Sequence, residues 1–324
     1  MPGDAPFATP EDLAAKTAAD GGAAPEARLK ACEELILWGS AASAMPALRE
    51  LHRLPRFAVR VRRIAAIARY LERAPDEFVF AGARQAEGRW ETLDGSAPGE
   101  SGAAGGAMLW LREGAQKTLL AFSNVHGGYG PMRGWASVAL LHRFLKRFAV
   151  NVIYLRDATR CLHVAGIPGL GDDYASCVAS LRALCAQRGW GEIYALGVSA
   201  GGYSALRYGL DLGARAVLSF SGPSDVTPHA DPAKRIAMYG TLYETVPGMA
   251  FDLLPLYRRS ARRPRLLLCF GEGNAYDAGM ARRMAEFPET ELVSFAFSEH
   301  TTFIEAMRLR QVETMVGRLI GAPS

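Results

Sequence analysis

The sequence predicts an α/β fold with a mostly parallel, doubly wound sheet and an antiparallel beginning. The first observation is that short apolar runs alternate with segments of helical periodicity from about residue 134 onward. Parallel strands need long crossover connections, and helices supply them. The second observation is that the apolar runs at 107–114 and 117–124 are joined only by a tight turn around Gly114 and Ala115, which is typical of an antiparallel pair.

The first part of the chain is predicted to be helical. Its opening 25 residues are rich in Ala, Gly, Pro and Asp and include a short helix at 11–19. Helical periodicity then continues as far as Pro75, which ends it. Residues 1–76 are therefore expected to form a helical N-terminal extension, and residues 77–324 the α/β domain.

The strands and helices of the α/β domain follow in regular order. Strands are expected at 78–82, 88–93, 107–114, 117–124, 150–155, 192–198, 215–221, 263–270 and 291–297. Helices are expected at 134–148, 173–188, from 200 onward, 277–286 and 302–320. An insertion at about 228–263 holds too many apolar residues for a simple surface loop. We expect a helical lid there, whose apolar side chains either line an acyl pocket or form the buried face of two ordinary helices.

Composition excludes a disordered chain and a membrane span. The 324 residues are 49% apolar, which is enough for a sizeable core. No apolar run approaches the roughly 18 residues that a spanning helix requires, and the first residues lack the pattern of a secretory signal. We therefore expect a cytoplasmic protein.

The cysteines give no sign of a metal or redox site. All five are scattered, with no Cys-x-x-Cys pair and no histidine at metal-ligand spacing. Reduced thiols in a packed interior are expected, and we expect neither a metal nor an organic cofactor.

Positive charge is concentrated in one segment. Residues 49–73 contain eight Arg and only two Glu, whereas the formal charge of the whole chain is +4. The arginine-rich helix at 56–73 would suit an acidic protein partner. Its apolar positions recur at spacings of four and three, so a solvated helix face explains the arginines as well. No nucleic-acid partner is expected.

The most informative motif is Gly197-Val198-Ser199-Ala200-Gly201, a Gly-x-Ser-x-Gly match between a predicted strand and a predicted helix. A sharp turn at this place strains the serine backbone and brings neighbouring segments together, so flanking glycines are needed. Ser199 is therefore the candidate nucleophile.

A nucleophilic serine of this kind needs donors for the negative charge that develops on the substrate oxygen. The N–H of Ala200 opens the helix after Ser199 and is one expected donor. A second donor is expected from the glycine-rich segment after the strand at 117–124, which contains Asn124, Val125, His126 and Gly127.

A serine hydroxyl also needs a base. Among the six histidines, His300 alone lies between the last predicted strand and the last predicted helix. We expect it to be the base, although the surrounding segment could also be an ordinary polar loop.

The acid that orients His300 is less clearly marked. In the usual pattern for such a triad an Asp stands about three residues beyond the glycine after the strand that is predicted here at 263–270, but that position is Asn274. Three carboxylates remain: Asp277, Glu272 and Asp225. We favour Asp277 because it keeps the order Ser, Asp, His, while a helix N-cap role would explain it as well.

These residues resemble the α/β-hydrolase superfamily over roughly residues 77–320. The segment 126–128 is similar to the His-Gly-Gly loop of lipases and esterases. The resemblance implies a serine hydrolase that cleaves an ester or thioester of a small-molecule or carrier-bound acyl substrate through an acyl-enzyme, with Ser199, His300 and Asp277 as the triad. The segments 152–160, 166–173 and 197–209 have a looser likeness to domains of bacterial surface-glycan proteins and accessory-secretion acetyltransferases. This likeness implies an acyltransferase or deacetylase acting on carbohydrate. A non-catalytic interaction protein on the same scaffold is the third alternative.

Overall fold

The computed structural model divides into two compact units, Met1–Phe78 with Met307–Arg310, and Val79–Ala306 with Gln311–Ser324. The structure describes residues 10–37, 41–58, 61–62, 64–65, 89–93, 106–123, 141–142, 144–157, 159–227, 241–300 and 302–321.

The N-terminal unit is helical. Its helices are α1 (Pro10–Ala19), α2 (Pro25–Leu37) and α3 (Ala41–Leu51), and the first two begin with proline, which suits a helix start. In the arginine-rich segment Phe57 and Ile64 are buried while Arg62 is exposed. This pattern fits a solvated arginine face; the remainder of 56–73 lies outside the described residues, and an acidic partner stays a prediction.

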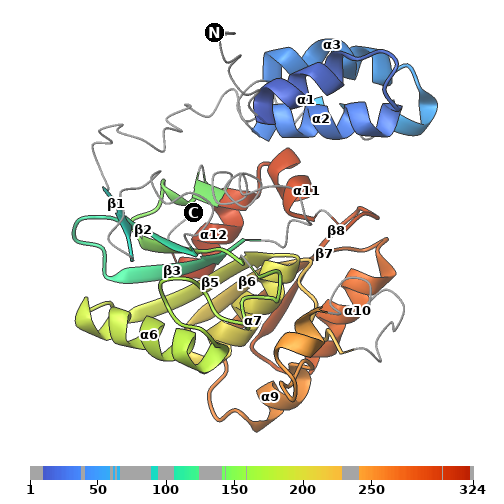
Figure 1. The fold of residues 1–324 in the computed structure, drawn as a ribbon. Coiled ribbons are helices and arrows are strands. Elements are labelled where there is room, and N and C mark those ends of the chain that lie inside the picture. The colour runs from blue at the N-terminus through green and yellow to red at the C-terminus, as the bar shows by residue number, and fades with distance from the viewer. Residues whose placement is uncertain are drawn as a thin grey trace, which may run out of the picture. The chain divides into compact units, whose positions relative to one another are not determined.

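The second unit contains an eight-stranded sheet with the order β1-β2-β4-β3-β5-β6-β7-β8 (Figure 1). The strands are β1 (Arg89–Thr92), β2 (Ala107–Leu111), β3 (Lys117–Phe122), β4 (Asn151–Leu155), β5 (Glu192–Val198), β6 (Ala216–Phe220), β7 (Arg265–Gly271) and β8 (Thr290–Phe295). β1 with β2 and β2 with β4 are antiparallel, and all other pairs are parallel. The predicted mostly parallel sheet with an antiparallel beginning is therefore confirmed, but the pairing expected between the strands at 107–114 and 117–124 is wrong, because β4 lies between β2 and β3. The strand expected at 78–82 lies outside the described residues.

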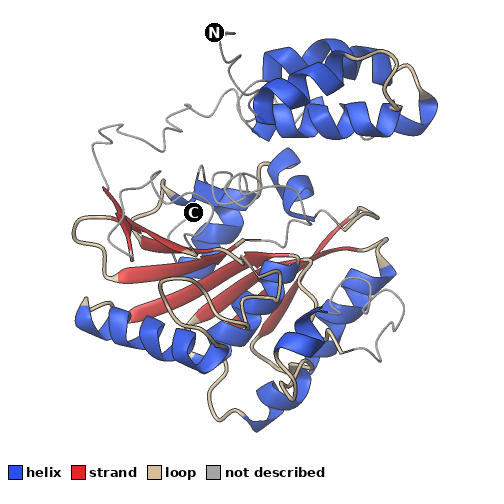
Figure 2. Ribbon diagram, viewed as in Figure 1, coloured by secondary structure: helices blue, strands red, loops and turns tan. Residues whose placement is uncertain are grey.

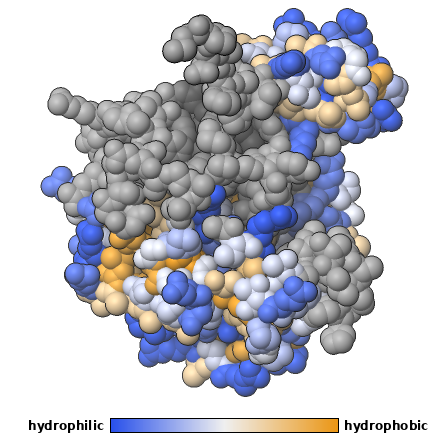
Figure 3. All heavy atoms as spheres, viewed as in Figure 1, coloured by the Kyte–Doolittle hydropathy of each residue, from blue (hydrophilic) through white to orange (hydrophobic). Residues whose placement is uncertain are grey.

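Helices cover both faces of this sheet (Figures 1 and 2). One face carries α6 (Tyr174–Gln187), α7 (Ala200–Asp211), α9 (Leu254–Arg259) and α10 (Ala275–Arg283), and the other carries α12 (Val312–Ile320). Hydrophilic residues make up much of the coloured surface in this view, with hydrophobic patches between them (Figure 3). α7 packs on the three central strands β3, β5 and β6, so its N-terminus is held at the middle of the sheet.

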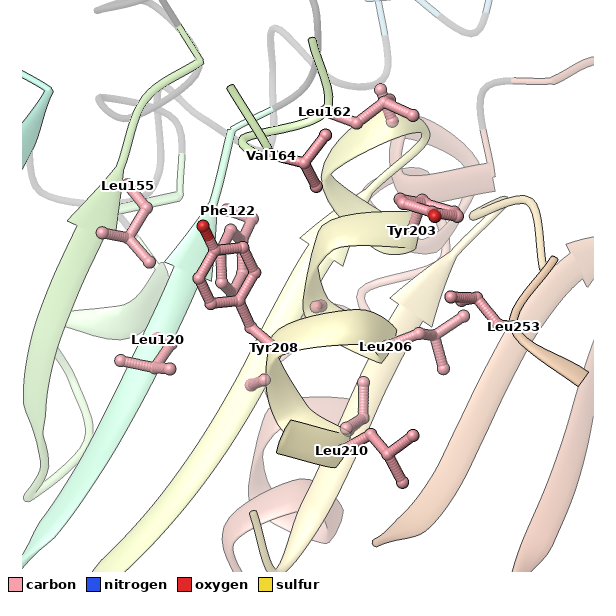
Figure 4. Packing of buried hydrophobic residues seen from close by; sticks show 14 of the residues in the cluster. Leu120, Phe122, Leu155, Leu162, Val164, Tyr203, Leu206, Tyr208, Leu210 and Leu253 are labelled. Atoms are coloured by element: carbon pink, nitrogen blue, oxygen red, sulfur yellow. The ribbon is translucent and has the colours of Figure 1, made fainter. Parts of the chain in front are cut away.

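The core between α7 and the sheet is apolar with a few anchoring hydroxyls (Figure 4). Leu120, Phe122 and Leu206 are at most 1% exposed. The Tyr208 hydroxyl donates to the backbone oxygen of His163 at 2.6 Å, so this buried polar group is satisfied. These contacts fix α7, and with it the turn that precedes it.

The last predicted helix, 302–320, is wrong in one respect, because the chain forms two helices there. α11 (Thr302–Arg308) ends in a turn in which the Gln311 N–H donates to the Ala306 carbonyl at 2.8 Å, and α12 follows. Arg310 lies in the left-handed region at φ 57°. No glycine or proline marks this break in the sequence.

The described part of the predicted insertion, residues 241–263, includes α9 and a helical turn at 241–245. Asp225, before the insertion, and Asp252, within it, form an isolated antiparallel bridge. Arg283 of α10 binds both carboxylates, at 2.6 Å and 2.8 Å. These two ion pairs attach the insertion and the segment before it to α10. A lid role for the insertion stays a prediction.

Two expectations from composition can be compared with the structure. Cys32, Cys161, Cys177, Cys185 and Cys269 are all free and buried, as predicted. Among the helices of the described residues, none is long and apolar enough to pass through a bilayer.

Candidate active site

Ser199 occupies the sharp turn between β5 and α7. Its backbone has φ 55° and ψ −120°, outside the regions that a non-glycine residue favours. Its N–H donates to the Phe220 carbonyl of the neighbouring strand at 2.8 Å. β5 before Ser199, α7 after it and this hydrogen bond together hold the residue in its strained conformation.

The flanking glycines are required by close backbone contacts. A Cβ on Gly197 would lie 2.0 Å from the carbonyl oxygen of Gly201. A Cβ on Gly201 would lie 2.5 Å from the carbonyl oxygens of Phe122 and Ser123, and one on Gly202 would lie 2.5 Å from Ser219 Oγ. Because two of these three collisions are with backbone, side chains are excluded at this turn.

His300 brings an imidazole to the serine. It lies five residues beyond the end of β8, and its Nε2 is 2.7 Å from Ser199 Oγ. Its Nδ1 is 2.8 Å from Asp277 Oδ1 and 3.0 Å from Oδ2. The three side chains, which come from distant parts of the sequence, therefore form one continuous hydrogen-bonded chain.

Burial differs along this chain of groups. The Asp277 side chain is 0% exposed, whereas that of His300 is 47% exposed. Asp277 lies in the first turn of α10, where the helix dipole stabilises a carboxylate. A buried carboxylate fixes one side of the imidazole, and the other side faces the serine.

Asn274 takes the helix-capping role that was an alternative for Asp277. Its side chain accepts a hydrogen bond from the Asp277 N–H at 3.1 Å. Asp277 thus lies three residues beyond the position at which the common pattern has an Asp, and it belongs to α10 instead of the loop before it.

The other two candidate acids bind different partners. Asp225 accepts from Arg283 at 2.6 Å and from the Thr227 N–H at 2.8 Å. Burial acts to raise the pKa of Asp225, but the hydrogen bonds from Thr227 and Arg283 outweigh it and lower that pKa. Glu272 is exposed and accepts from Ser294 Oγ at 2.5 Å. Of the three carboxylates, Asp277 is the one that His300 contacts.

Two further histidines serve packing. His142 and His163 are buried, and their Nδ1 atoms lie 2.8 Å from Tyr154 Oη and from Ser204 Oγ, respectively. Burial lowers the pKa of both rings, that of His142 to about 3.

The predicted oxyanion donors are described only in part. Ala200 is the first residue of α7, and the N–H groups of a first helical turn have no partner within the helix. Asn124, Val125, His126 and Gly127 lie outside the described residues, so a second donor in that segment stays a prediction.

Comparison with known proteins gives structural matches only. No protein-family model and no curated protein matches the chain. MPT51 of Mycobacterium tuberculosis is similar with a TM-score of 0.50 and 13% identity, over 69% of this chain and 96% of that one. An esterase of the bacterial hormone-sensitive lipase family is similar with a TM-score of 0.50 and 14% identity, over 95% of this chain and 94% of that one. The chain has the α/β-hydrolase fold.

The α/β-hydrolase fold explains why the three side chains meet. Ser199 follows β5, Asp277 follows β7 and His300 follows β8, and these parallel strands end at one edge of the sheet. Their order along the chain, Ser, Asp, His, is the one that this fold uses. Sequence reasoning missed Ser221, which follows β6, and Thr302, which opens α11; their hydroxyl oxygens lie 2.5 Å apart.

Proposed function

We propose that this α/β-hydrolase is a serine hydrolase that cleaves an ester or thioester of a small-molecule or carrier-bound acyl substrate. The observation that carries the proposal is the continuous contact from Ser199 Oγ to His300 Nε2 at 2.7 Å and from His300 Nδ1 to Asp277 Oδ1 at 2.8 Å. Each group has a neighbour suited to its role: a nucleophile with a base, and a base with an orienting carboxylate.

Asp277 sets the tautomer of the imidazole. A carboxylate can only accept at His300 Nδ1, so the ring carries its proton there and turns the lone pair of Nε2 toward Ser199. When His300 takes the serine proton it becomes positively charged, and the buried carboxylate stabilises that charge.

The reaction then has two halves. Ser199 Oγ forms a bond to the substrate carbonyl carbon while His300 Nε2 takes its proton, and the Ala200 N–H donates to the oxyanion. The bond to the leaving alkoxide or thiolate breaks, and His300 returns the proton to that group. In the second half His300 takes a proton from water, the hydroxide adds to the acyl-enzyme, and the carboxylic acid leaves as Ser199 recovers its proton.

Exposure of His300 favours water as the acceptor. Its side chain is 47% exposed, so a water molecule can approach the face of the acyl-enzyme next to the base. Transfer of the acyl group to a carbohydrate hydroxyl, or removal of an acetyl group from an acetylated carbohydrate, would use the same acyl-enzyme. An added sugar acceptor that diverts product from free acid to sugar ester would identify a transferase.

Fluorophosphonate labelling tests the proposal. Wild-type protein should be labelled at Ser199 and should hydrolyse short-chain aryl esters, and Ser199→Ala should do neither. Ser298→Ala is the matched control, because Ser298 is an exposed serine on the segment that carries His300. If the folded wild-type protein takes no label and turns over no aryl ester, the proposal is wrong and a non-catalytic interaction role replaces it.

A further inference from the structure

Two buried hydroxyls join the end of β6 to the residue that opens α11. Ser221 Oγ lies 2.5 Å from Thr302 Oγ1. Ser221 is 4% exposed and Thr302 is 0% exposed, so water does not compete for this hydrogen bond. Thr302 follows His300 by two residues, and the pair therefore holds the segment that carries the imidazole.

The Ser221 end of this pair is fixed by the sheet. Its N–H donates to the Cys269 carbonyl of β7 at 2.8 Å, and its backbone adopts φ 50°, in the left-handed region. The preceding residue, Phe220, accepts the N–H of Ser199 at 2.8 Å. Phe220, at the end of β6, thus holds the backbone of Ser199. The next residue, Ser221, holds the segment that carries His300.

The other end of the His300 segment has its own attachment. The Gly273 N–H donates to the Phe297 carbonyl at 2.9 Å, and Asp277 binds the imidazole directly. With the His300 side chain about half exposed, packing contributes little to its placement. Attachment at Phe297 and at Thr302 therefore sets where the segment places the ring, and Asp277 holds its Nδ1 side.

From this geometry we propose that Ser221 and Thr302 are positioning residues that hold the His300 imidazole within hydrogen-bonding distance of Ser199. The inference rests on the proposed function for its kinetic consequence. Displacement of a base by about 1 Å can cost on the order of 100-fold in rate. Since neither hydroxyl takes part in the triad, their loss should lower kcat and leave substrate binding nearly unchanged.

The test uses single and double variants of the full chain. Thr302→Val and Ser221→Ala each remove one hydroxyl, and each should lower kcat by about 10-fold to 100-fold with KM within about twofold. The double variant should be no worse than either single one, because both remove the same hydrogen bond. Thr302→Ser keeps the hydroxyl and should restore kcat.

Thr118→Val is the matched control. Thr118 is buried in β3, and its hydroxyl has no hydrogen-bond partner among the residues that the structure describes. The same loss of a buried hydroxyl should leave kcat unchanged there. If Thr118→Val lowers kcat as much as Thr302→Val, or if Thr302→Val and Ser221→Ala keep wild-type kcat, the positioning role is wrong.

A second readout does not depend on turnover. In the wild-type protein, the His300 Nδ1 proton should give a low-field NMR resonance because Asp277 accepts it. Thr302→Val and Ser221→Ala should weaken or abolish that resonance through faster exchange, and Thr302→Ser should keep it. An inactive wild-type protein would contradict the proposed function, and the resonance would still decide the positioning role: an unchanged signal in both variants overturns it.

Discussion

Asn274 caps α10 and holds Asp277: the side-chain oxygen of Asn274 accepts the backbone N–H of Asp277, in the first turn of the helix, at 3.1 Å. The cap sets where the helix begins, and the helix presents the carboxylate to His300. Asn274, at the position where an Asp was expected, thus helps to hold Asp277, the proposed acid, in place.

Loss of this cap should reduce both stability and turnover. Asn274→Ala is expected to lower the free energy of unfolding by about 1 kcal/mol, because an N-cap oxygen is lost. Its kcat should fall as well, since Asp277 is held less firmly. Asn274→Ser retains a capping oxygen and should keep both quantities near the wild-type values in denaturant titrations and ester assays. A fully active Asn274→Ala protein would contradict the link between cap and acid.

Replacing the acid should remove most of the activity and little of the stability. Asp277→Asn is expected to lower kcat by about 10⁴-fold, because the amide favours the wrong tautomer of His300. Glu272→Gln makes the same change on an exposed carboxylate and should retain full turnover. Asp225→Asn loses charge from the Arg283 pair, so it should lower the unfolding midpoint but preserve turnover of the folded protein. Loss of turnover in Asp225→Asn with an active Asp277→Asn would reverse the assignment.

Burial of His142 predicts a loss of stability in acid. Its pKa is lowered to about 3 in the folded chain, mainly by burial and also by Lys146, whereas an unfolded histidine titrates near pH 6.5. Between these values the unfolded chain binds the extra proton, so the free energy of unfolding falls as pH falls. Protonation of His142 alone should therefore make the free energy of unfolding about 2 kcal/mol lower at pH 5 than at pH 7.5.

Urea unfolding at pH 5 and pH 7.5 measures this effect. His142→Gln should show a smaller difference between the two pH values than the wild-type protein. His52→Gln, at an exposed histidine, should keep the wild-type difference. Equal differences in all three proteins would contradict the assignment of acid sensitivity to His142.

The turn at Ser199 should not tolerate a side chain at Gly197. A Cβ there would lie 2.0 Å from backbone oxygen, so Gly197→Ala should prevent folding or displace Ser199 and abolish labelling. Gly279→Ala in α10 is the matched control, since nothing lies within 4 Å of its added Cβ. That variant should gain about 0.5–1 kcal/mol in stability, because alanine favours a helix. Circular dichroism and labelling report both results.

The parts of the fold and the site that local sequence determines could be predicted. Alternating strands and helices place the sheet, glycines at 197 and 201 mark the turn at Ser199, and the position of His300 after the last strand indicates the base. These signals are short-range: periodicity, steric need for glycine, and position relative to a strand.

The remaining features depend on tertiary contacts that no local pattern encodes. Arg310 adopts a left-handed conformation usually reserved for glycine, so the break between α11 and α12 had no sequence signal. Ser221 and Thr302 are ordinary residues until the sheet brings them together. Choice of the acid needed the spatial position of His300, because Asp277, Asp225 and Glu272 all follow strands of the same sheet edge.

The central claim is that Ser199 becomes covalently acylated with His300 as its base. The most direct measurement is mass spectrometry of the protein quenched during turnover of an aryl ester, followed by peptide mapping. We predict an acyl adduct on the peptide that contains Ser199, formed rapidly in the wild-type protein and not in His300→Ala. Rapid ester turnover with no adduct, or an adduct on another residue, would contradict the account.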